Sequence, residues 1–325
     1  MPPHALIALG LALLVALSID RWWGEPRVRL HPVVWMGHYL GWVGAWLQRH
    51  AVQTPGTRDA RSFWLGALAW VAGATVVVAT AWLLQSLCLA LPWWAAGLLL
   101  GLLFKPLFAW GMLKNEVQAV EAALAESLPA GRERLRWLVS RDVTELTVTE
   151  VRESAIETLA ENLNDSVVAP IFWFLLLGLP GAALYRFANT ADAMWGYAGV
   201  HQGRNWAWAG KWAARVDDVL SWVPARTTAV LLMLVAGTAG WRRAGQLRAQ
   251  ARQTPSPNSG WPMAAMALVL DVALRKPGAY VLNPLGRAVL SADTETAIKI
   301  ATKSLFALMV SAGAATILIV SWRAL

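Results

Sequence analysis

The segment FWLGALAWVAGATVVVATAWLL, residues 63–84, is apolar throughout and contains no charged residue. About 20 consecutive apolar residues in a helix span the roughly 30 Å hydrocarbon core of a bilayer. The segment therefore predicts a transmembrane helix. Whether the chain crosses the membrane once or several times depends on the rest of the sequence.

The overall composition also indicates a membrane protein. The chain has 325 residues, of which 57% are hydrophobic and only 15% are charged, and its mean hydropathy is +0.45. Soluble domains carry roughly 25% charged residues. The 21 tryptophans against 4 tyrosines agree with this interpretation, because indole rings favour the interface between lipid and water.

Three further segments have the length and apolar character of membrane spans, or nearly so. They are residues 5–19, 93–113 and 304–322, the second of which is interrupted by Lys105-Pro106. Residues 5–19 follow no basic stretch and precede no clear cleavage site, so we expect a retained span and not a signal peptide.

Residues 167–185 and 227–241 are ambiguous, since they are either a further pair of crossings or re-entrant helices enclosed by protein. Runs that alternate at strand period are absent, and helical stripes are common. We therefore predict an all-α polytopic integral membrane bundle, with about four to six membrane segments, in a single domain over residues 1–325.

The arginines predict an orientation. Residues 20–62 and 114–166 are rich in arginine, whereas the connection 85–92 carries no charge. Cytoplasmic loops carry an excess of Lys and Arg. We expect a multi-pass protein of the cell inner (cytoplasmic) membrane, with the N-terminus outside and a helical and loop-built active site facing the cytoplasm.

Several classes of function are excluded or disfavoured. The net charge of +8 is spread over several loops without a nucleic-acid-binding motif, so we predict no nucleic-acid partner. A single cysteine, Cys88, excludes an intrachain disulfide and a multi-cysteine zinc site. No Walker-type loop, H-E-x-x-H or G-x-S-x-G is present. Any chemistry must rest on carboxylates, Asn, Arg and Lys.

The most informative polar cluster is in residues 140–170. Thr147 or Thr149 can cap a helix whose stripe of Glu150, Glu153, Glu157 and Glu161 would ordinarily be a solvated face. Asn162, Asn164 and Asp165 then stand at the entry to an apolar segment, where an uncompensated polar group is costly. Oxygen ligands of this kind suit Mg²⁺, which binds through one or two carboxylates and substrate phosphates.

Four other clusters border apolar segments and have plainer alternatives. Residues 20–37 offer Asp20, Glu25 and His31 either as ligands or as parts of an interfacial loop. In 185–205, Asn189 and Asp192 can share a helix face. Residues 210–226 can likewise place Lys211, Arg215 and Asp218 on one helix face. There the alternative is an ordinary structural ion pair between arginine and aspartate. Residues 256–274 are a turn that leads into a helix.

These blocks resemble a known family. The stretches are DRWWGEP (20–26), HPVVWMG (31–37), SRDVTEL (140–146), AIETLAENLNDSVVAPIFW (155–173), GLPGAALYRFANTADAMWGY (178–197), WAARVDDVLSWVPAR (212–226) and SPNSGWPMAAMA (256–267). Over about residues 18–285 the chain resembles the CobD/CbiB family, the adenosylcobinamide-phosphate synthases of cobalamin biosynthesis.

The resemblance implies an acid–amine ligase. With ATP and Mg²⁺, such an enzyme joins adenosylcobyric acid to (R)-1-aminopropan-2-ol or its O-phosphate, with an acyl phosphate as the expected intermediate. The corrinoid is then a substrate and not a cofactor. The expected partners are these substrates, membrane lipid, other late enzymes of the pathway and further copies of the chain.

The resemblance also suggests residue roles. We assign catalysis to Asp165, Asp192 and Asp218, and metal binding to Asp165, Glu161 and Asp192. Nucleotide binding is assigned to Glu161, Asn162, Asn189, Arg141, Arg215, Asn258 and Ser259, and substrate binding to His31, Arg186, Lys211 and Arg204. Arginine favours two-pronged contacts to phosphate or carboxylate. Two alternatives are an AmpE-like regulatory membrane protein without ligase activity and a transporter, in which intramembrane Asp, Asn and Arg mark a solute path.

Overall fold

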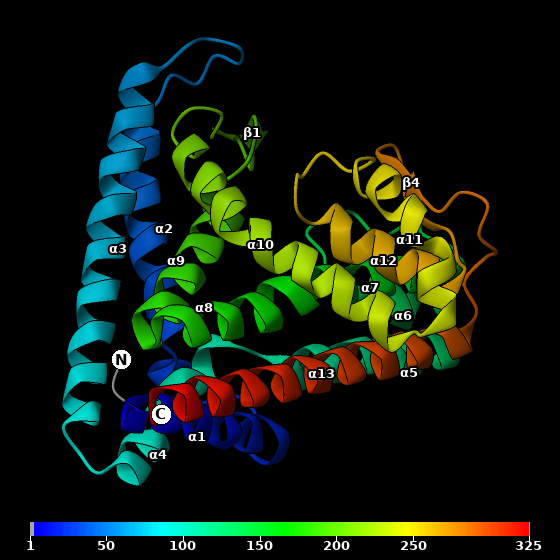
Figure 1. Cartoon of the computed structure of the whole chain (residues 1–325). Helices are drawn as coiled ribbons and strands as arrows, with labels where there is room; N and C mark the ends of the chain where they lie inside the picture. The colour runs from blue at the N-terminus through cyan, green and yellow to red at the C-terminus, as the bar shows by residue number, and fades with distance from the viewer. Residues whose placement is uncertain (1–2, 325) are drawn as a thin grey trace. The chain divides into compact units, whose positions relative to one another are not determined.

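The computed structural model describes residues 3–324, and 75% of the chain is helical (Figure 1). Five helical stretches are long and apolar enough to cross a bilayer. They are His4–Trp22, Ala60–Leu89, Trp93–Glu126, Lys211–Val235 and Ser291–Ile319. The predicted class, a polytopic all-α membrane protein, is confirmed.

The four predicted spans all coincide with these helices. Residues 5–19 lie in α1 (Pro3–Trp22), residues 63–84 in α3 (Ala60–Leu89) and residues 304–322 in α13 (Ser291–Ala324). The stretch 93–113 is interrupted where Lys105-Pro106 predicts it. There α4 (Trp93–Phe104) gives way to a 3-10 turn, η2 (Lys105–Leu107), before α5 (Trp110–Glu126) begins.

The two ambiguous segments differ from each other. Residues 227–241 fall on the end of α10 (Lys211–Val235), which is long and apolar enough to cross, and on the start of α11 (Thr238–Ala251). Residues 167–185 lie wholly within the described chain and form no helix of spanning length. Gly178, with a φ of +72°, instead separates α8 (Ala169–Leu177) from α9 (Leu179–Trp195).

The chain forms two compact units, each assembled from separate stretches of sequence. Unit 1 contains the residues up to Phe108, Ala169–Leu220 and the residues from Thr316 on. Unit 2 contains Ala109–Val168 and Ser221–Ala315. Helices α10 and α13 contribute residues to both units. The single domain over residues 1–325 stays a prediction.

In unit 1, two glycines set the packing of α4 against α1. A Cβ atom at Gly97 would lie 2.7 Å from the Leu11 side chain, and one at Gly101 would lie 2.7 Å from that of Val15. Glycines four residues apart allow close approach of membrane helices. Because both contacts advance by four residues along each helix, α1 and α4 run parallel and end on the same side.

The remaining helices of unit 1 pack around α3. Helix α2 (Pro32–His50) and α9 both meet Gly73 of α3, where a Cβ atom would lie 2.5 Å from Tyr39 and 2.5 Å from Phe187. The Gln85 side chain of α3 accepts a 2.7 Å hydrogen bond from the first backbone N–H of α9, at Leu179. Helices α2, α3 and α9 therefore form a closely packed layer (Figure 1).

Unit 2 is built around a buried helix, α7 (Val148–Leu163), which packs against α5, α6 (Leu128–Leu135) and α12 (Gly260–Leu270). Thr147 caps α7, because its side chain accepts a hydrogen bond from Glu150 N–H while the Glu150 carboxylate accepts from Thr147 N–H. Of the two predicted caps, Thr147 is confirmed. The reciprocal pair satisfies two backbone donors that the helix itself leaves unpaired.

Two small antiparallel hairpins were not predicted. Strands β1 (Val200–His201) and β2 (Arg204–Asn205) form one in unit 1, and β3 (Leu274–Lys276) and β4 (Tyr280–Leu282) form the other in unit 2. Each strand has only two or three residues, which is shorter than the run of about four to eight from which strand alternation is recognised.

Candidate functional site

The predicted metal-binding residues lie where α7 ends in a π-helical turn, η3 (Asn164–Val168). Such turns are frequent at functional sites. The Asn164 amide donates a 2.7 Å hydrogen bond to Asp165 Oδ1 and accepts one of 3.1 Å from the Thr228 hydroxyl on α10. These bonds fix the orientation of the Asp165 carboxylate within unit 2.

Glu161, one helical turn before Asp165, is the least compensated carboxylate of this region. Loss of hydration, followed by the negative charges of Asp165 and Glu157, raises the pKa of Glu161 from 4.5 to about 7. Lys276 and Arg141 act in the opposite direction. The Glu161 backbone carbonyl accepts a hydrogen bond from Asn164 N–H, but no hydrogen bond or ion pair joins the Glu161 carboxylate to another residue of the described range 3–324. A cation between Glu161 and Asp165 would relieve their repulsion.

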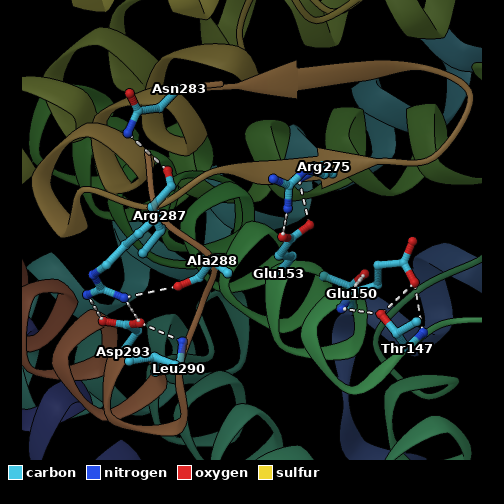
Figure 2. A network of polar contacts seen from close by, with 11 residues as sticks. Thr147, Glu150, Glu153, Arg275, Asn283, Arg287, Ala288, Leu290 and Asp293 are labelled. Atoms are coloured by element: carbon cyan, nitrogen blue, oxygen red, sulfur yellow. Dashed lines mark hydrogen bonds and ion pairs between the residues drawn. The ribbon is translucent and has the colours of Figure 1, made fainter. Parts of the chain in front are cut away.

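The glutamate stripe of α7 is not a solvated face, contrary to the ordinary interpretation of such a stripe. Glu153 is 0% exposed and Glu157 is 5% exposed. The Arg275 side chain donates to Glu153 at 2.6 Å and the Arg275 backbone N–H at 3.1 Å (Figure 2). The unpredicted β3–β4 hairpin supplies Arg275, which is why the sequence suggested a solvated face.

Glu157 is held by two donors from different parts of unit 2. Arg141 Nη2 donates to Glu157 at 3.0 Å and to the Ser154 hydroxyl at 2.7 Å. The Tyr280 hydroxyl, on β4, donates to the other carboxylate oxygen of Glu157. Burial and the negative charge of Glu157 raise the pKa of Tyr280 above its ordinary value. Tyr280 therefore remains a proton donor at physiological pH.

Arg141 has unused hydrogen-bonding capacity. Its Nη1 atom is buried and has no hydrogen-bond partner among the described residues. An unsatisfied buried donor of a charged group is costly unless a ligand completes it. Arg141 therefore fits its predicted role as a binder of phosphate or carboxylate oxygens.

The loop before α12 is more rigid than its turn sequence suggests. Arg226 donates to Asn258 Oδ1 at 2.9 Å, and its guanidinium lies 4.3 Å from the Trp222 ring and 4.7 Å from the Trp261 ring. The backbone N–H groups of Asn258 and Ser259 each donate to the Ser256 hydroxyl at 3.2 Å. Arg226 was not predicted from the sequence, in which the available signal was Trp222, one helical turn before it.

The other predicted residues lie in unit 1. Arg186, Asn189 and Asp192 share α9, and Arg186 donates to Asn189 at 3.4 Å. On α10, the Lys211 ammonium lies 4.2 Å from the Trp208 ring, and Arg215 and Asp218 follow it. Arg204 is exposed on β2. The structure thus gathers Glu161, Asn162 and Asp165 at one helix end, and it places the eight others from His31 to Asp218 in a different unit.

A second buried charge cluster was largely missed. Lys105, 2% exposed, places its ammonium 3.1 Å from Asp20, 2.8 Å from Glu25 and 3.3 Å from the Phe108 carbonyl. His31 Nε2 lies 3.3 Å from the second oxygen of Glu25. Burial acts to raise the pKa of Glu25, but the hydrogen bonds from His31 and Lys105 hold it below its ordinary value. A lysine inside an apolar span was the available signal.

A magnesium–nucleotide site fits the end of α7. Within residues 3–324 no three His, Cys, Asp or Glu side chains form a metal-binding group. Mg²⁺, however, commonly binds through two or fewer carboxylates, with substrate phosphates and water completing its coordination. Glu161 and Asp165 supply such a pair, and Arg141 supplies a free buried donor. The Asn162 side-chain oxygen accepts a 3.3 Å hydrogen bond from the Ser166 hydroxyl, and its nitrogen donates to the Thr158 carbonyl at 3.1 Å, so that oxygen keeps one lone pair for a ligand. Asp192, the third predicted metal ligand, lies in unit 1, and its metal-binding role stays a prediction.

Fold and site together define a polytopic α-helical membrane protein with a carboxylate pair beside a half-buried arginine and a half-buried tyrosine. A family model described as CobD/Cbib protein matches residues 13–308. The chain belongs to the CobD/CbiB family, as its sequence blocks indicate. No solved structure matches the chain.

Curated relatives agree with this assignment over most of their length. The chain is 40% identical over 274 residues to a probable cobalamin biosynthesis protein CobD of Methanothermobacter thermautotrophicus, covering 83% of this chain and 86% of the relative. It is 36% identical over 282 residues to the CobD of Halalkalibacterium halodurans (83% and 82%). It is 40% identical over 267 residues to that of Chromobacterium violaceum (82% and 81%).

Proposed function

We propose that this chain acts in cobalamin biosynthesis as an adenosylcobinamide-phosphate synthase. It would use ATP and Mg²⁺ to join adenosylcobyric acid to (R)-1-aminopropan-2-ol O-phosphate or to aminopropanol. The single observation that carries the proposal is the family match over residues 13–308. We further propose a location in the inner membrane with the site open to the cytoplasm.

Amide formation needs an activated carboxylate. An oxygen of the corrinoid propionate attacks the γ-phosphorus of ATP, the bond to ADP breaks, and an acyl phosphate forms. The amine nitrogen then attacks the acyl carbon, phosphate leaves, and a base takes the proton. When bound, Mg²⁺ would offset phosphate charge and align the reacting groups.

The residues of unit 2 support the phosphoryl-transfer half of this scheme. Glu161 and Asp165 would hold the cation, because their mutual repulsion favours positive charge between them. Arg141 would donate through its free Nη1 atom to a phosphate or propionate oxygen. Asn162 would add an amide ligand, and Asn258 and Ser259 would line the nucleotide site from the loop that Arg226 fixes.

The residues of unit 1 would serve the amine half of the reaction. Asp218 would accept the amine proton or orient Arg215, while Asn189 and Asp192 would form a second ligand pair. His31, Arg186, Lys211 and Arg204 would contact the substrates. Oligomers and contacts with other late pathway enzymes belong to the same proposal.

The deciding experiment uses purified protein in lipid nanodiscs. We would incubate it with ATP, Mg²⁺, adenosylcobyric acid and aminopropanol phosphate, and detect the amide by mass spectrometry. We expect an ATP-dependent product that is lost in Asp165→Asn but retained in Glu295→Gln, a matched change at an exposed carboxylate paired with Lys299. Absence of product from folded wild-type protein would instead favour the AmpE-like or transport alternative.

A further inference from the structure

Unit 1 contains a large, mostly apolar cavity, and His31, one of the residues assigned to the reaction, adjoins it between the lining residues Leu30 and Pro32. Its volume is about 630 Å³, within the roughly 300–1,000 Å³ range of small-molecule sites. Its walls come from the ends of α1 and α4, from η2, from α2, α3 and α9, and from the segment between α1 and α2. Trp23 and Trp35 line it and are themselves exposed, so the cavity opens at the protein surface beside them.

The mouth of the cavity lies at the predicted edge of the membrane. Helix α1 is a candidate span that ends at Trp22, and the chain turns there because Gly24, with a φ of +72°, donates to the Ile19 carbonyl. Trp22, Trp23 and Leu30 are exposed in the segment that follows. Tryptophans in such positions anchor a protein at the lipid–water interface.

The exposed charge at the mouth is positive. Asp20, near the end of α1, and Glu25, in the segment that follows, each form an ion pair with buried Lys105; Glu25 and Lys105 line the cavity as this neutralised pair. Arg21, Arg27 and Arg29 are exposed. The Arg29 carbonyl accepts a 3.0 Å hydrogen bond from Trp35 Nε1, which ties the arginine-bearing turn to α2 at the cavity rim.

From this arrangement we infer that the cavity is a binding site for an anionic phospholipid. An acyl chain occupies the apolar cavity, and the phosphate headgroup meets Arg27 and Arg29 at the mouth. Apolar walls favour the chain, while exposed arginines near a membrane surface favour anionic over zwitterionic headgroups. The inference goes beyond the proposed ligase chemistry, and its test needs no turnover.

The test compares lipids with identical chains. Detergent-solubilised full-length protein is incubated with equal amounts of phosphatidylglycerol and phosphatidylcholine, and bound lipid is counted by native mass spectrometry. We expect wild-type protein to retain one lipid, with phosphatidylglycerol preferred by at least about fivefold, the effect of a single arginine near the surface. Equal retention of the two lipids would overturn the proposal.

Two variants distinguish the site for the acyl chain from the site for the headgroup. Thr80→Trp adds a ring at an exposed position of α3 that lines the cavity, and it should abolish retention of both lipids. The matched control is Thr75→Trp. Thr75 lines a different, smaller hollow on α3, and this variant should retain lipid as wild type does. If Thr80→Trp retains as much lipid as wild type, the assignment of the cavity to the acyl chain is wrong.

The doubly substituted Arg27→Gln, Arg29→Gln protein tests the headgroup site without touching the core. It should still retain a lipid but bind the two headgroups about equally. An undiminished preference for phosphatidylglycerol would contradict the assignment of the headgroup to these arginines. Because both positions are exposed, this test stands even where Thr80→Trp fails to fold.

Discussion

Each unit contains a buried cluster of carboxylates, and the two clusters are compensated differently. Around Lys105, both carboxylates have a cationic partner, and His31 adds a contact to Glu25. Along α7, Glu153 and Glu157 are also matched, but the compensation ends at Glu161, whose pKa is raised to about 7. A cluster in which every carboxylate has a cationic partner stabilises the packing around it, and we call it matched. A cluster in which one carboxylate lacks such a partner remains available to a ligand, and we call it incompletely matched.

The largest expected effect is at the matched cluster. Lys105→Met would leave Asp20 and Glu25 partly or fully buried without their cation. Breaking a buried ion pair from one side costs about 3–5 kcal/mol. We expect the free energy of unfolding, measured by circular dichroism in mixed micelles, to fall by this amount.

The control for this prediction is Lys299→Met, which removes an exposed lysine from an exposed pair with Glu295. It should leave unfolding unchanged. Equal stability of Lys105→Met and wild type would mean that the Lys105 cluster is not structural, and the contrast with α7 would be lost.

The next effect concerns pH at the incompletely matched cluster. The pKa of Glu161 is about 7 in the folded protein against 4.5 ordinarily, so between these values the folded state holds a proton that the unfolded state has released. The free energy of unfolding therefore falls as pH rises from 4.5 through 7, by roughly 3 kcal/mol in total. Glu161→Gln should remove this loss and be the more stable protein at pH 8.

The measurement is a pair of unfolding curves at pH 5 and pH 8 in a buffer with chelator. The groups that face Glu161 are Asp165 and Glu157, which repel it, and Lys276 and Arg141, which attract it. Adding Mg²⁺ to wild type at pH 8 should recover part of the lost stability through Glu161 and Asp165. Identical pH dependence in Glu161→Gln and wild type would show that this carboxylate is matched after all.

A smaller effect tests what positions the Lys105 cluster. In Gly101→Ala the new Cβ atom would lie 2.7 Å from Val15 and 2.8 Å from the Ala12 carbonyl, so α4 must move away from α1. Such overpacking costs about 1–3 kcal/mol. Gly10→Ala is the control, because nothing lies within 4 Å of the added atom. Thermal unfolding should distinguish the two variants, and equal melting temperatures would argue against the close packing of α1 and α4.

The smallest effect is at the start of α7. Thr147→Ala removes the side-chain cap and should cost about 1 kcal/mol, whereas Thr149→Ala, two residues further on, should cost less. If the two changes are equal in chemical unfolding, the capping box at Thr147 and Glu150 contributes nothing to the position of the acidic helix.

Much of the fold could be predicted because a membrane span is a property of composition over a long window. The four predicted spans and the break at Lys105 needed no knowledge of tertiary contacts. The β3–β4 hairpin could not be predicted, because its strands are three residues long. The burial of Glu153 and Glu157 depends on that hairpin. Because the hairpin was not predicted, the interpretation of these glutamates as a solvated face was wrong.

The candidate site was predictable only where its residues are neighbours in sequence. Glu161, Asn162 and Asp165 lie within two helical turns, so their proximity follows from local geometry alone. The partners of the site, Arg275, Tyr280 and Thr228, come from segments more than 60 residues away. Nothing local to α7 indicates them.

The parallel pairing of α1 with α4 has a consequence for how the chain is made. The Leu11 and Val15 face of α1 finds its glycine-bearing partner only after roughly 80 more residues have been synthesised. At about 5–20 residues per second, α1 waits roughly 4–16 s for its partner. During that interval lipid, an insertion factor or the helices made before α4 must cover this face. Substitutions at Gly97 or Gly101 should therefore reduce the yield of inserted protein, even where the finished molecule tolerates them.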